Sequence, residues 1–315
     1  MSDLAPSLST RPSTVRNAAH SADVPPLRPG PDEPPIRISL AQWSIRELHW
    51  NGGLDPLDFP RASAERWGIH GVEYVNGFFK DRVGDEAWVA QLRKRADDHG
   101  VRSLLIMCDG LGRLGDPDAA ARREAVLNHQ SAIDAVVQLG GHSIRVNAGS
   151  AGERDEQARL AADGLRQLCE LAEPSKINVI VENHGGWSSD GSWLAEVMRR
   201  VDHPRIGTLP DFGNFNLGGG RTYDPYRGVQ ELMPWARAVS AKSRRFNDAG
   251  DEIDLDYRIL MGTVLDSGYR GWVGIEYEGG DPDGPAGVML TKALIERVLA
   301  ERGVPVAAAG ERVAP

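Results

Sequence analysis

The sequence predicts a closed barrel of eight parallel strands, each followed by a helix, the (β/α)8 fold. From Ile36 onward, short apolar stretches alternate with longer helical stretches in eight units of roughly 30 to 40 residues, the pattern of parallel βαβ units. The chain of 315 residues is long enough for one such barrel. An open doubly wound sheet is the rival, but it normally carries a glycine-rich phosphate turn, and neither GxGxxG nor GxxxxGK[ST] occurs here.

The expected strands are short apolar stretches that end in polar residues or glycine. In 177–186 (INVIVENHGG), four of the first five residues are apolar, and Glu182, Asn183 and His184 follow them. Valine and isoleucine at this density favour a buried strand. The expected strand segments, in chain order, are 36–44, 70–75, 101–110, 142–149, 177–186, 205–214, 238–243 and 271–280.

Helices are expected between the strands, where apolar residues recur at helical spacing. The clearest start is Asp116 followed by Pro117, a capping carboxylate and a first-turn proline, from which one long helix is expected to run to Leu139. The other expected helical segments are one that ends near Trp67, and 85–99, 153–173, 192–201, 226–235, 256–267 and 285–302.

One domain is predicted, the barrel of residues 36–302, between two tails. Residues 1–35 are polar and rich in Pro, Ser and Arg, without an apolar stretch of signal-peptide length, so we expect a disordered tail. Residues 303–315 are expected to form a flexible C-terminal tail. No run of 18 apolar residues occurs, and Cys108 and Cys169 lack CxxC spacing, so we expect a cytoplasmic protein with reduced core thiols.

The charge of the chain narrows the class of partner. The formal net charge is -9 at pH 7. Binding to nucleic acid or to an anionic membrane relies on a basic surface, so both are expected to be absent. We expect a small-molecule partner, either neutral or cationic, or an anionic one held by a few local Arg and Lys side chains.

Polar side chains follow the predicted strands at the end where barrel enzymes place their catalytic groups. Residues two apart on a strand face the same side, and four of the eight strands end in such a pair. A ring of polar groups would be costly to bury in a purely structural core. The ring consists of Gln42, Glu73, Asp109, Arg145 with Asn147, Glu182 with His184, Asp211 with Asn214, Ser240 with Lys242, and Glu276 with Glu278.

Three carboxylates in this ring, Glu182, Asp211 and Glu276, would repel one another at one barrel mouth and therefore require a positive charge among them. A divalent metal is one answer, and an all-oxygen ligand set favours Mg²⁺ or Mn²⁺ over zinc. The side chains of Lys242 and Arg145 are the alternative counter-charges.

The motifs LAQWS, GVEYV, VIVENHGG, LPDFGNF, SAKS and GIEYEG resemble, in this order, the xylose isomerase-like TIM-barrel superfamily. Within it the chain looks most like the sugar phosphate isomerase/epimerase branch, which is also similar to ketose 3-epimerases. The resemblance covers roughly 36–299. It implies a metal held by Glu182, Asp211 and Glu276. The family's fourth ligand, a His two residues before the strand-seven Lys, is Ser240 here, and another frequent His is Asn214.

The activity expected from the resemblance is that of a sugar isomerase or epimerase, which removes a proton next to the carbonyl of a keto-sugar or related polyol. Glu182 and Glu276 are expected to flank the substrate, with a metal or Lys242 stabilising the enediolate. Trp43 or Phe79 is expected to stack on an apolar sugar face. The expected substrate contacts are Glu73, Arg145, His184, Asn214, Trp43 and Glu278.

Two other functions are compatible with these residues, and a third is disfavoured. The same groups could drive β-elimination, which makes a lyase on a keto-sugar, keto-glycoside or cyclitol the runner-up. A non-catalytic sugar-binding barrel is the third reading, since the strand-seven His is replaced by Ser240. A DNA nuclease, as some relatives are, would need a histidine-rich zinc cluster and a basic face, which this acidic chain lacks. The family leads us to expect a homo-oligomer.

Overall fold

The computed structural model describes residues 35–305. The predicted tails, 1–35 and 303–315, therefore fall almost entirely outside the described residues. Within the described part, no helix is long and apolar enough to cross a membrane.

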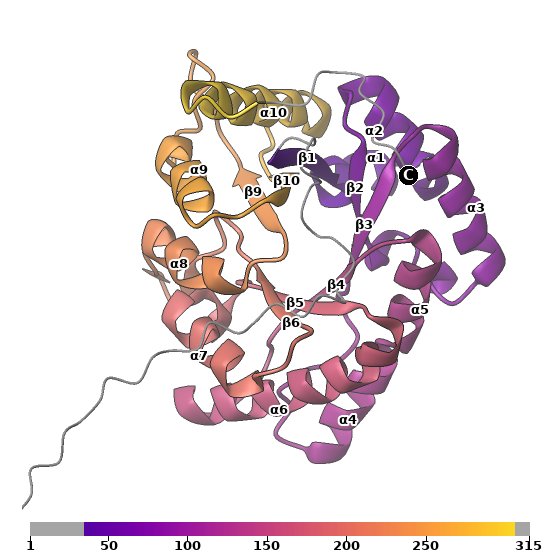
Figure 1. Ribbon diagram of the computed structural model, residues 1–315, viewed down its shortest axis with the longest axis vertical. Helices are drawn as coiled ribbons and strands as arrows, with labels where there is room; N and C mark the ends of the chain where they lie inside the picture. The colour runs from indigo at the N-terminus through magenta and orange to yellow at the C-terminus, as the bar shows by residue number, and fades with distance from the viewer. Residues whose placement is uncertain (1–34, 306–315) are drawn as a thin grey trace, which may run out of the picture.

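Eight parallel strands form the barrel, as predicted, and helices surround them (Figure 1). Hydrogen-bonded neighbours follow the order β6-β5-β4-β3-β2-β1-β10-β9. Two isolated parallel bridges, Thr208 with Ala236 and Asp211 with Ser240, join the outer strands and bring the barrel close to closure. The strands are β1 Ile36–Ala41, β2 Gly71–Val75, β3 Arg102–Met107, β4 Ser143–Val146, β5 Asn178–Glu182, β6 Ile206–Leu209, β9 Val239–Ser243 and β10 Gly271–Tyr277.

The helices follow the strands in the predicted alternation. Most begin at an aspartate whose carboxylate accepts backbone N–H groups of the first turn, as Asp85, Asp190 and Asp256 do. The helices are α1 Arg46–Trp50, α2 Phe59–Trp67, α3 Glu86–Asp98, α4 Ala119–Asn128, α5 Gln130–Leu139, α6 Arg154–Ala172, α7 Gly191–Val201, α8 Pro225–Leu232, α9 Tyr257–Asp266 and α10 Gly284–Glu301.

The single helix expected from Asp116 to Leu139 is wrong. The structure has two helices, α4 and α5, which meet at His129. The N-cap of α4 is Asp118, whose carboxylate accepts the backbone N–H groups of Ala120 and Ala121. The Asp116 carboxylate instead accepts the N–H of Asp118 and precedes the helix. The chain bends at His129, whose buried ring bonds the carbonyl oxygen of Ala125 at 2.7 Å.

The apolar core consists of two clusters, one outside the strands and one inside the barrel. The larger lies between the strands and the helices and includes Leu92, Ile133, Leu168 and Trp193. The smaller contains Leu105, Met107, Ile180 and Leu209, which alternate with outward-facing residues and so point toward the barrel axis. The polar strand ends lie above this smaller cluster, which closes the barrel beneath the site.

Candidate active site at the carboxyl ends of the strands

Three buried carboxylates from separate strands converge at the barrel mouth. Glu182 ends β5, Asp211 follows β6 and Glu276 lies near the end of β10. Each offers an oxygen, and these oxygens lie within 4.8 Å of one another. The three residues are at most 4% exposed. The structure therefore brings together the three residues that the sequence singled out, and this acidic triad could hold a metal ion. Its role as a ligand set stays a prediction.

The ammonium group of Lys242, on β9, lies among these carboxylates. Its Nζ is 3.0 Å from Glu276 Oε1, 3.7 Å from Asp211 Oδ2 and 3.2 Å from Glu278 Oε2. Burial alone would lower the pKa of Lys242, but the attraction of Asp211 and Glu276 raises it above its usual range. Lys242 is therefore a permanent positive charge in the site.

Ser240 connects two members of the triad. Its Oγ lies 2.6 Å from Asp211 Oδ2 and 2.8 Å from Glu276 Oε2, so its single proton serves one carboxylate at a time. The other oxygen of Asp211 accepts the backbone N–H groups of Gly213 and Asn214, both at 2.8 Å. The hydroxyl of Ser240, on β9, thus fixes two carboxylates, one after β6 and one on β10.

Arg145, on β4, supplies the second buried cation. Its Nε lies 2.9 Å from Glu182 Oε2, and its Nη1 donates to Asp109 Oδ1 at 2.8 Å. The Nε–Glu182 pair is close but not aligned as a hydrogen bond, so Glu182 Oε2 has no aligned donor among the described residues. Asn147 also donates to Asp109, and Asn214 donates to Glu182 Oε1 at 2.8 Å. The Asn214 side chain therefore supports Glu182, although the sequence paired this residue with Asp211.

The site carries more negative than positive charge. Burial raises the pKa values of Glu182 and Asp211 well above the usual range for carboxyl groups, although Arg145 and Lys242 oppose this shift. Five carboxylates form ion pairs with only three cationic side chains. A bound divalent cation would supply the two positive charges that are missing when all five carboxylates are ionised. The carboxylates are Asp109, Glu182, Asp211, Glu276 and Glu278, and the cations are Arg145, Lys242 and Arg244.

Glu73 lies one layer deeper in the barrel than the triad. Its fully buried carboxyl group accepts a 2.6 Å hydrogen bond from Ser39 Oγ. A side chain at Gly274, the register partner of Ser39 on β10, would overlap this carboxyl group. Burial raises the pKa of Glu73 to about 7. The expected contact between Glu73 and a sugar hydroxyl stays a prediction.

The remaining predicted residues surround the mouth. His184 is exposed after β5, and partial burial, Arg145 and Lys242 lower its pKa, so its ring is neutral at pH 7. The indole N–H of Trp43 donates to Glu278 Oε1 at 2.9 Å. The expected contacts of these residues with a substrate stay predictions.

Asn183 is a positioning residue that the sequence reasoning missed. Its Oδ1 accepts the backbone N–H of Asp211 at 2.7 Å, and its Nδ2 donates to the carbonyl oxygen of Asp211 at 3.0 Å. It thereby joins the end of β5 to the loop after β6. Its place between Glu182 and His184 indicated only that it would face the opposite side of the strand.

Three aromatic rings line the β1–β2 side of the mouth and are called the aromatic wall: Trp43, Trp50 and Phe78. The expectation that Phe79 stacks on a sugar is wrong, because Phe79 is 5% exposed and stacks on Trp88. The chain turns through the 3-10 helix Asn76–Phe78 after β2, which ends the strand alternation and turns Phe78 toward the mouth.

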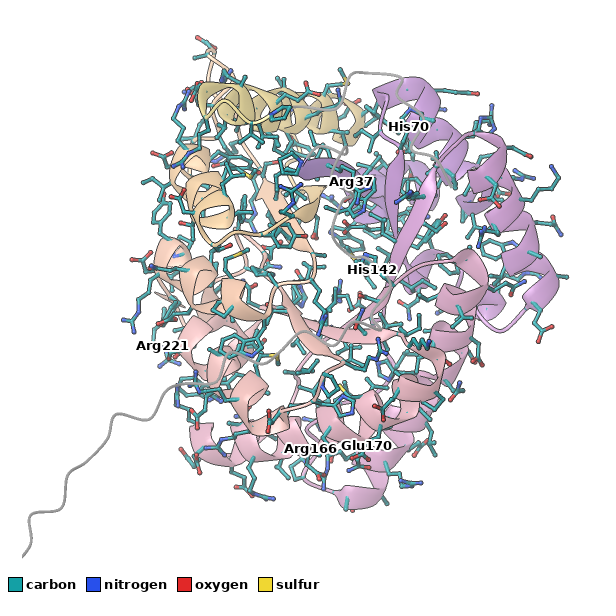
Figure 2. All side chains as sticks on the ribbon, in the orientation of Figure 1. Arg37, His70, His142, Arg166, Glu170 and Arg221 are labelled. Carbon is teal, nitrogen blue, oxygen red and sulfur yellow. The ribbon has the colours of Figure 1, made fainter. Side chains whose placement is uncertain are left out.

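The glycine-rich segment 217–228 contains most of a small hairpin of β7 Asn216–Gly218 and β8 Arg221–Thr222. Tyr223 and Arg227 both bond Glu231 of α8. Arg221 is exposed, in the region of α7 and α8 (Figure 2).

Comparison with known proteins places this geometry in context. A family model described as xylose isomerase-like TIM barrel matches residues 62–297. A comparison with curated proteins finds no match. Among solved structures, the IolI protein with a bound zinc atom has 13% identity and a TM-score of 0.65, with 84% of this chain and 98% of that chain covered.

Two further solved structures have the same fold. The 3-keto-D-glucoside 4-epimerase from E. coli has 14% identity and a TM-score of 0.63, with 84% of this chain and 100% of that chain covered. A xylose isomerase-like TIM-barrel protein from Mycobacterium smegmatis, in complex with magnesium, has 15% identity and a TM-score of 0.63, with 84% and 97% covered. At these identities the similarity establishes the fold.

Proposed function

The chain belongs to the xylose isomerase-like TIM-barrel family, and from this membership and the site geometry we propose that it is a sugar isomerase or epimerase. Its reaction is proton removal from, and proton return to, the carbon next to the carbonyl of a keto-sugar or related polyol. The observation that carries the proposal is a pair of buried acids, Glu182 and Glu276, each held by a different cation. Solved structures of the same fold include D-psicose 3-epimerase and 3-keto-D-glucoside 4-epimerase, which supports this reaction class.

Glu182 and Glu276 act as the acid–base pair. One carboxylate takes the proton, the C–H electron pair becomes the double bond of an enediolate, and the acid form of the other group returns a proton to carbon. Arg145 and Asn214 orient Glu182, whereas Lys242 and Ser240 orient Glu276. Lys242 also faces the negative charge that develops on the carbonyl oxygen, where a buried ammonium is most effective.

The residues fit a divalent cation. Their oxygens converge within 4.8 Å, Glu182 Oε2 is buried without an aligned donor, and the ligand set contains only oxygen, which suits Mn²⁺ or Mg²⁺. Glu182, Asp211 and Glu276 would hold the ion, and when bound it would polarise the substrate carbonyl. Ser240 leaves the ion without the family's histidine ligand.

The substrate contacts follow from the position of each side chain at the mouth. Arg145, His184 and Asn214 lie on the β4–β6 side and are suited to donate to sugar hydroxyl groups. Trp43 and Glu278 lie on the opposite side, where an indole face and a carboxylate are neighbours. Glu73 acts from below, as a buried carboxyl group beneath the reacting carbon.

Hydrogen exchange with solvent tests the reaction directly. The protein would be incubated in D₂O with D-fructose, D-tagatose and 3-keto-D-glucosides, and loss of the proton next to the carbonyl followed by NMR. We expect exchange with at least one of them, and Glu182→Gln and Glu276→Gln should each slow it by roughly 100-fold or more. Glu156→Gln, on the surface of α6, is the matched control and should exchange at the wild-type rate.

Two results would contradict the proposal: no exchange with any keto-sugar, or exchange that survives both site substitutions. The NMR spectrum also separates the outcomes, since an epimer keeps the composition of the substrate and a lyase product lacks water or another leaving group. Elemental analysis before and after chelation tests the metal, which should be lost in Glu182→Gln.

A further inference from the structure

The aromatic wall is a compact group of rings at the edge of the barrel mouth. Trp43 and Trp50 meet edge to face, with centroids 5.5 Å apart and planes at 89°. Phe78 lies 6.1 Å from Trp43 and 6.2 Å from Trp50. These are the separations at which aromatic pairs attract one another. Trp50 is nevertheless 57% exposed, so a large apolar surface faces solvent beside the proposed reaction centre.

The wall is connected to the reaction centre through one carboxylate. Trp43 donates to Glu278 Oε1 at 2.9 Å, and Glu278 Oε2 lies 3.2 Å from Lys242 Nζ. Lys242 in turn bonds Glu276. Trp43 is therefore linked to the acid–base pair, and Trp50, at the end of α1, contacts Trp43 and is the most exposed ring of the wall.

Neighbouring side chains hold two of the rings, Trp43 and Phe78, in place. The guanidinium of Arg46 lies over Trp43 at 5.5 Å and donates to the carbonyl oxygen of Tyr277 at 3.2 Å. The ring of His49 lies 4.8 Å from Phe78, and its Nδ1 is 2.9 Å from the carbonyl oxygen of Leu54. Side chains fixed in this way lose little freedom when a ligand stacks on them, which favours binding.

We propose that the aromatic wall is a subsite for a second ring, so that the substrate is a keto-glycoside rather than a free ketose. This inference rests on the function proposed above. The keto-sugar lies over Glu182 and Glu276, and the ring carried by its glycosidic oxygen stacks on the exposed face of Trp50. Because the planes of Trp43 and Trp50 stand at 89°, a sugar that lies flat on Trp43 cannot also lie flat on Trp50, so a single sugar leaves the face of Trp50 uncovered. A flat ring with an apolar face covers it.

Affinity for two matched glycosides tests the subsite. Dissociation constants would be measured by calorimetry for methyl and phenyl 3-keto-D-glucopyranosides, which differ only in the group that would reach Trp50. The wild-type protein should bind the phenyl glycoside roughly three- to tenfold more tightly, as expected for an added aromatic contact. In Trp50→Ala the ratio of the two constants should fall to about one. Ile259→Ala, which shortens an equally exposed side chain on α9, should keep the wild-type ratio.

Equal affinities in the wild-type protein, a preference that survives Trp50→Ala, or no binding of either glycoside would overturn the subsite. The ratio of two constants reports the subsite alone, whereas hydrogen exchange reports the reaction. Exchange with D-fructose or D-tagatose together with equal glycoside affinities would leave the reaction standing and remove the second ring. Tighter binding of the phenyl glycoside without hydrogen exchange on any keto-sugar would support the subsite for the second ring and contradict the proposed reaction.

Discussion

At the scale of single residues, the site depends on pairing buried charges. Arg145 is 5% exposed and contacts Glu182 and Asp109, so its removal leaves a buried carboxylate without its cation. We expect Arg145→Met to lower the free energy of unfolding by about 3–5 kcal/mol at pH 7, as when one partner of a buried pair is lost. Urea unfolding followed by circular dichroism measures this change.

The control for Arg145 is Lys94→Met, which removes an exposed ion pair with Asp98 on α3. Its cost should be below about 1 kcal/mol, because solvent screens such pairs. Equal costs for the two substitutions would mean that Arg145 is not needed to compensate the buried carboxylates.

Ser240 allows a second prediction for a single residue. Its hydroxyl stands between Asp211 and Glu276, where the family resemblance places a histidine ligand. Ser240→His should raise the affinity for Mn²⁺ at least roughly tenfold, since it adds a nitrogen donor to the oxygen set. Titration calorimetry measures the affinity, and Ser240→Ala, which adds no donor, is the control. An affinity in Ser240→His no higher than in Ser240→Ala would place the ion elsewhere.

The rule that barrel enzymes carry their functional groups at the carboxyl ends of the strands correctly predicted that Glu182, Asp211 and Glu276 would meet. The alternation of side chains within a strand, in contrast, gives no direction for residues beyond the strand end. Phe78 and Trp50 follow β2 and β1 in short helices, where the alternation no longer determines direction, and so the aromatic wall could not be read from the sequence.

At the scale of elements, the pattern of apolar residues locates the strands, but it does not locate every helix boundary. The pattern located every barrel strand, because a strand buried on both faces is a short apolar run. It merged α4 and α5, because His129 is compatible with a helix and only its buried contact with Ala125 shows the break. This contact joins residues only four apart, but the pattern of apolar residues carries no information about it.

Gly164, in the middle of α6, shows how tightly the helices pack. A Cβ at this position would overlap the carbonyl oxygen of Leu114, in the segment between β3 and α4. Alanine is the better helix former by about 1 kcal/mol, so propensity alone predicts that Gly164→Ala stabilises the protein. We expect the overlap to prevail and the free energy of unfolding to fall by about 1–3 kcal/mol.

Thermal and urea unfolding of Gly164→Ala would be compared with Gly53→Ala. A Cβ at Gly53 would lie 3.5 Å from the nearest atom, an ordinary contact, so little change is expected there. A gain in stability for Gly164→Ala would show that α6 can move away from Leu114 without cost.

At the scale of the whole molecule, opposite charges gather at the two ends of the barrel. Carboxylates dominate the carboxyl ends of the strands, whereas arginines lie near the amino ends. Arg37, the second residue of β1, and His142, which precedes β4, lie at the amino ends of their strands and are labelled in Figure 2. The guanidinium of Arg37 stacks on Trp272 at 4.5 Å, and Arg237 bonds the carbonyl oxygen of Ile206. This arrangement follows from the fold and could not be read from net charge.

Burial of His142 beside these arginines makes the stability of the protein depend on pH. Burial, with repulsion from Arg237 and Arg37, lowers the pKa of His142 to about 3, against 6.5 in the unfolded chain. Between these values only the unfolded state takes up the proton, so this group lowers stability as the pH falls below 6.5. The loss should reach about 2 kcal/mol at pH 5.

His142→Gln removes the titrating ring, so the variant should lose about 2 kcal/mol less than the wild type between pH 7 and pH 5. Urea unfolding at both pH values measures the difference. Glu73 acts with the opposite sign, because its pKa is raised to about 7 and the folded state holds its proton more tightly. That contribution is common to both proteins and cancels in the comparison. If His142→Gln keeps the wild-type slope, burial and the arginines do not hold the ring neutral, and the amino end of the barrel admits enough water to solvate it.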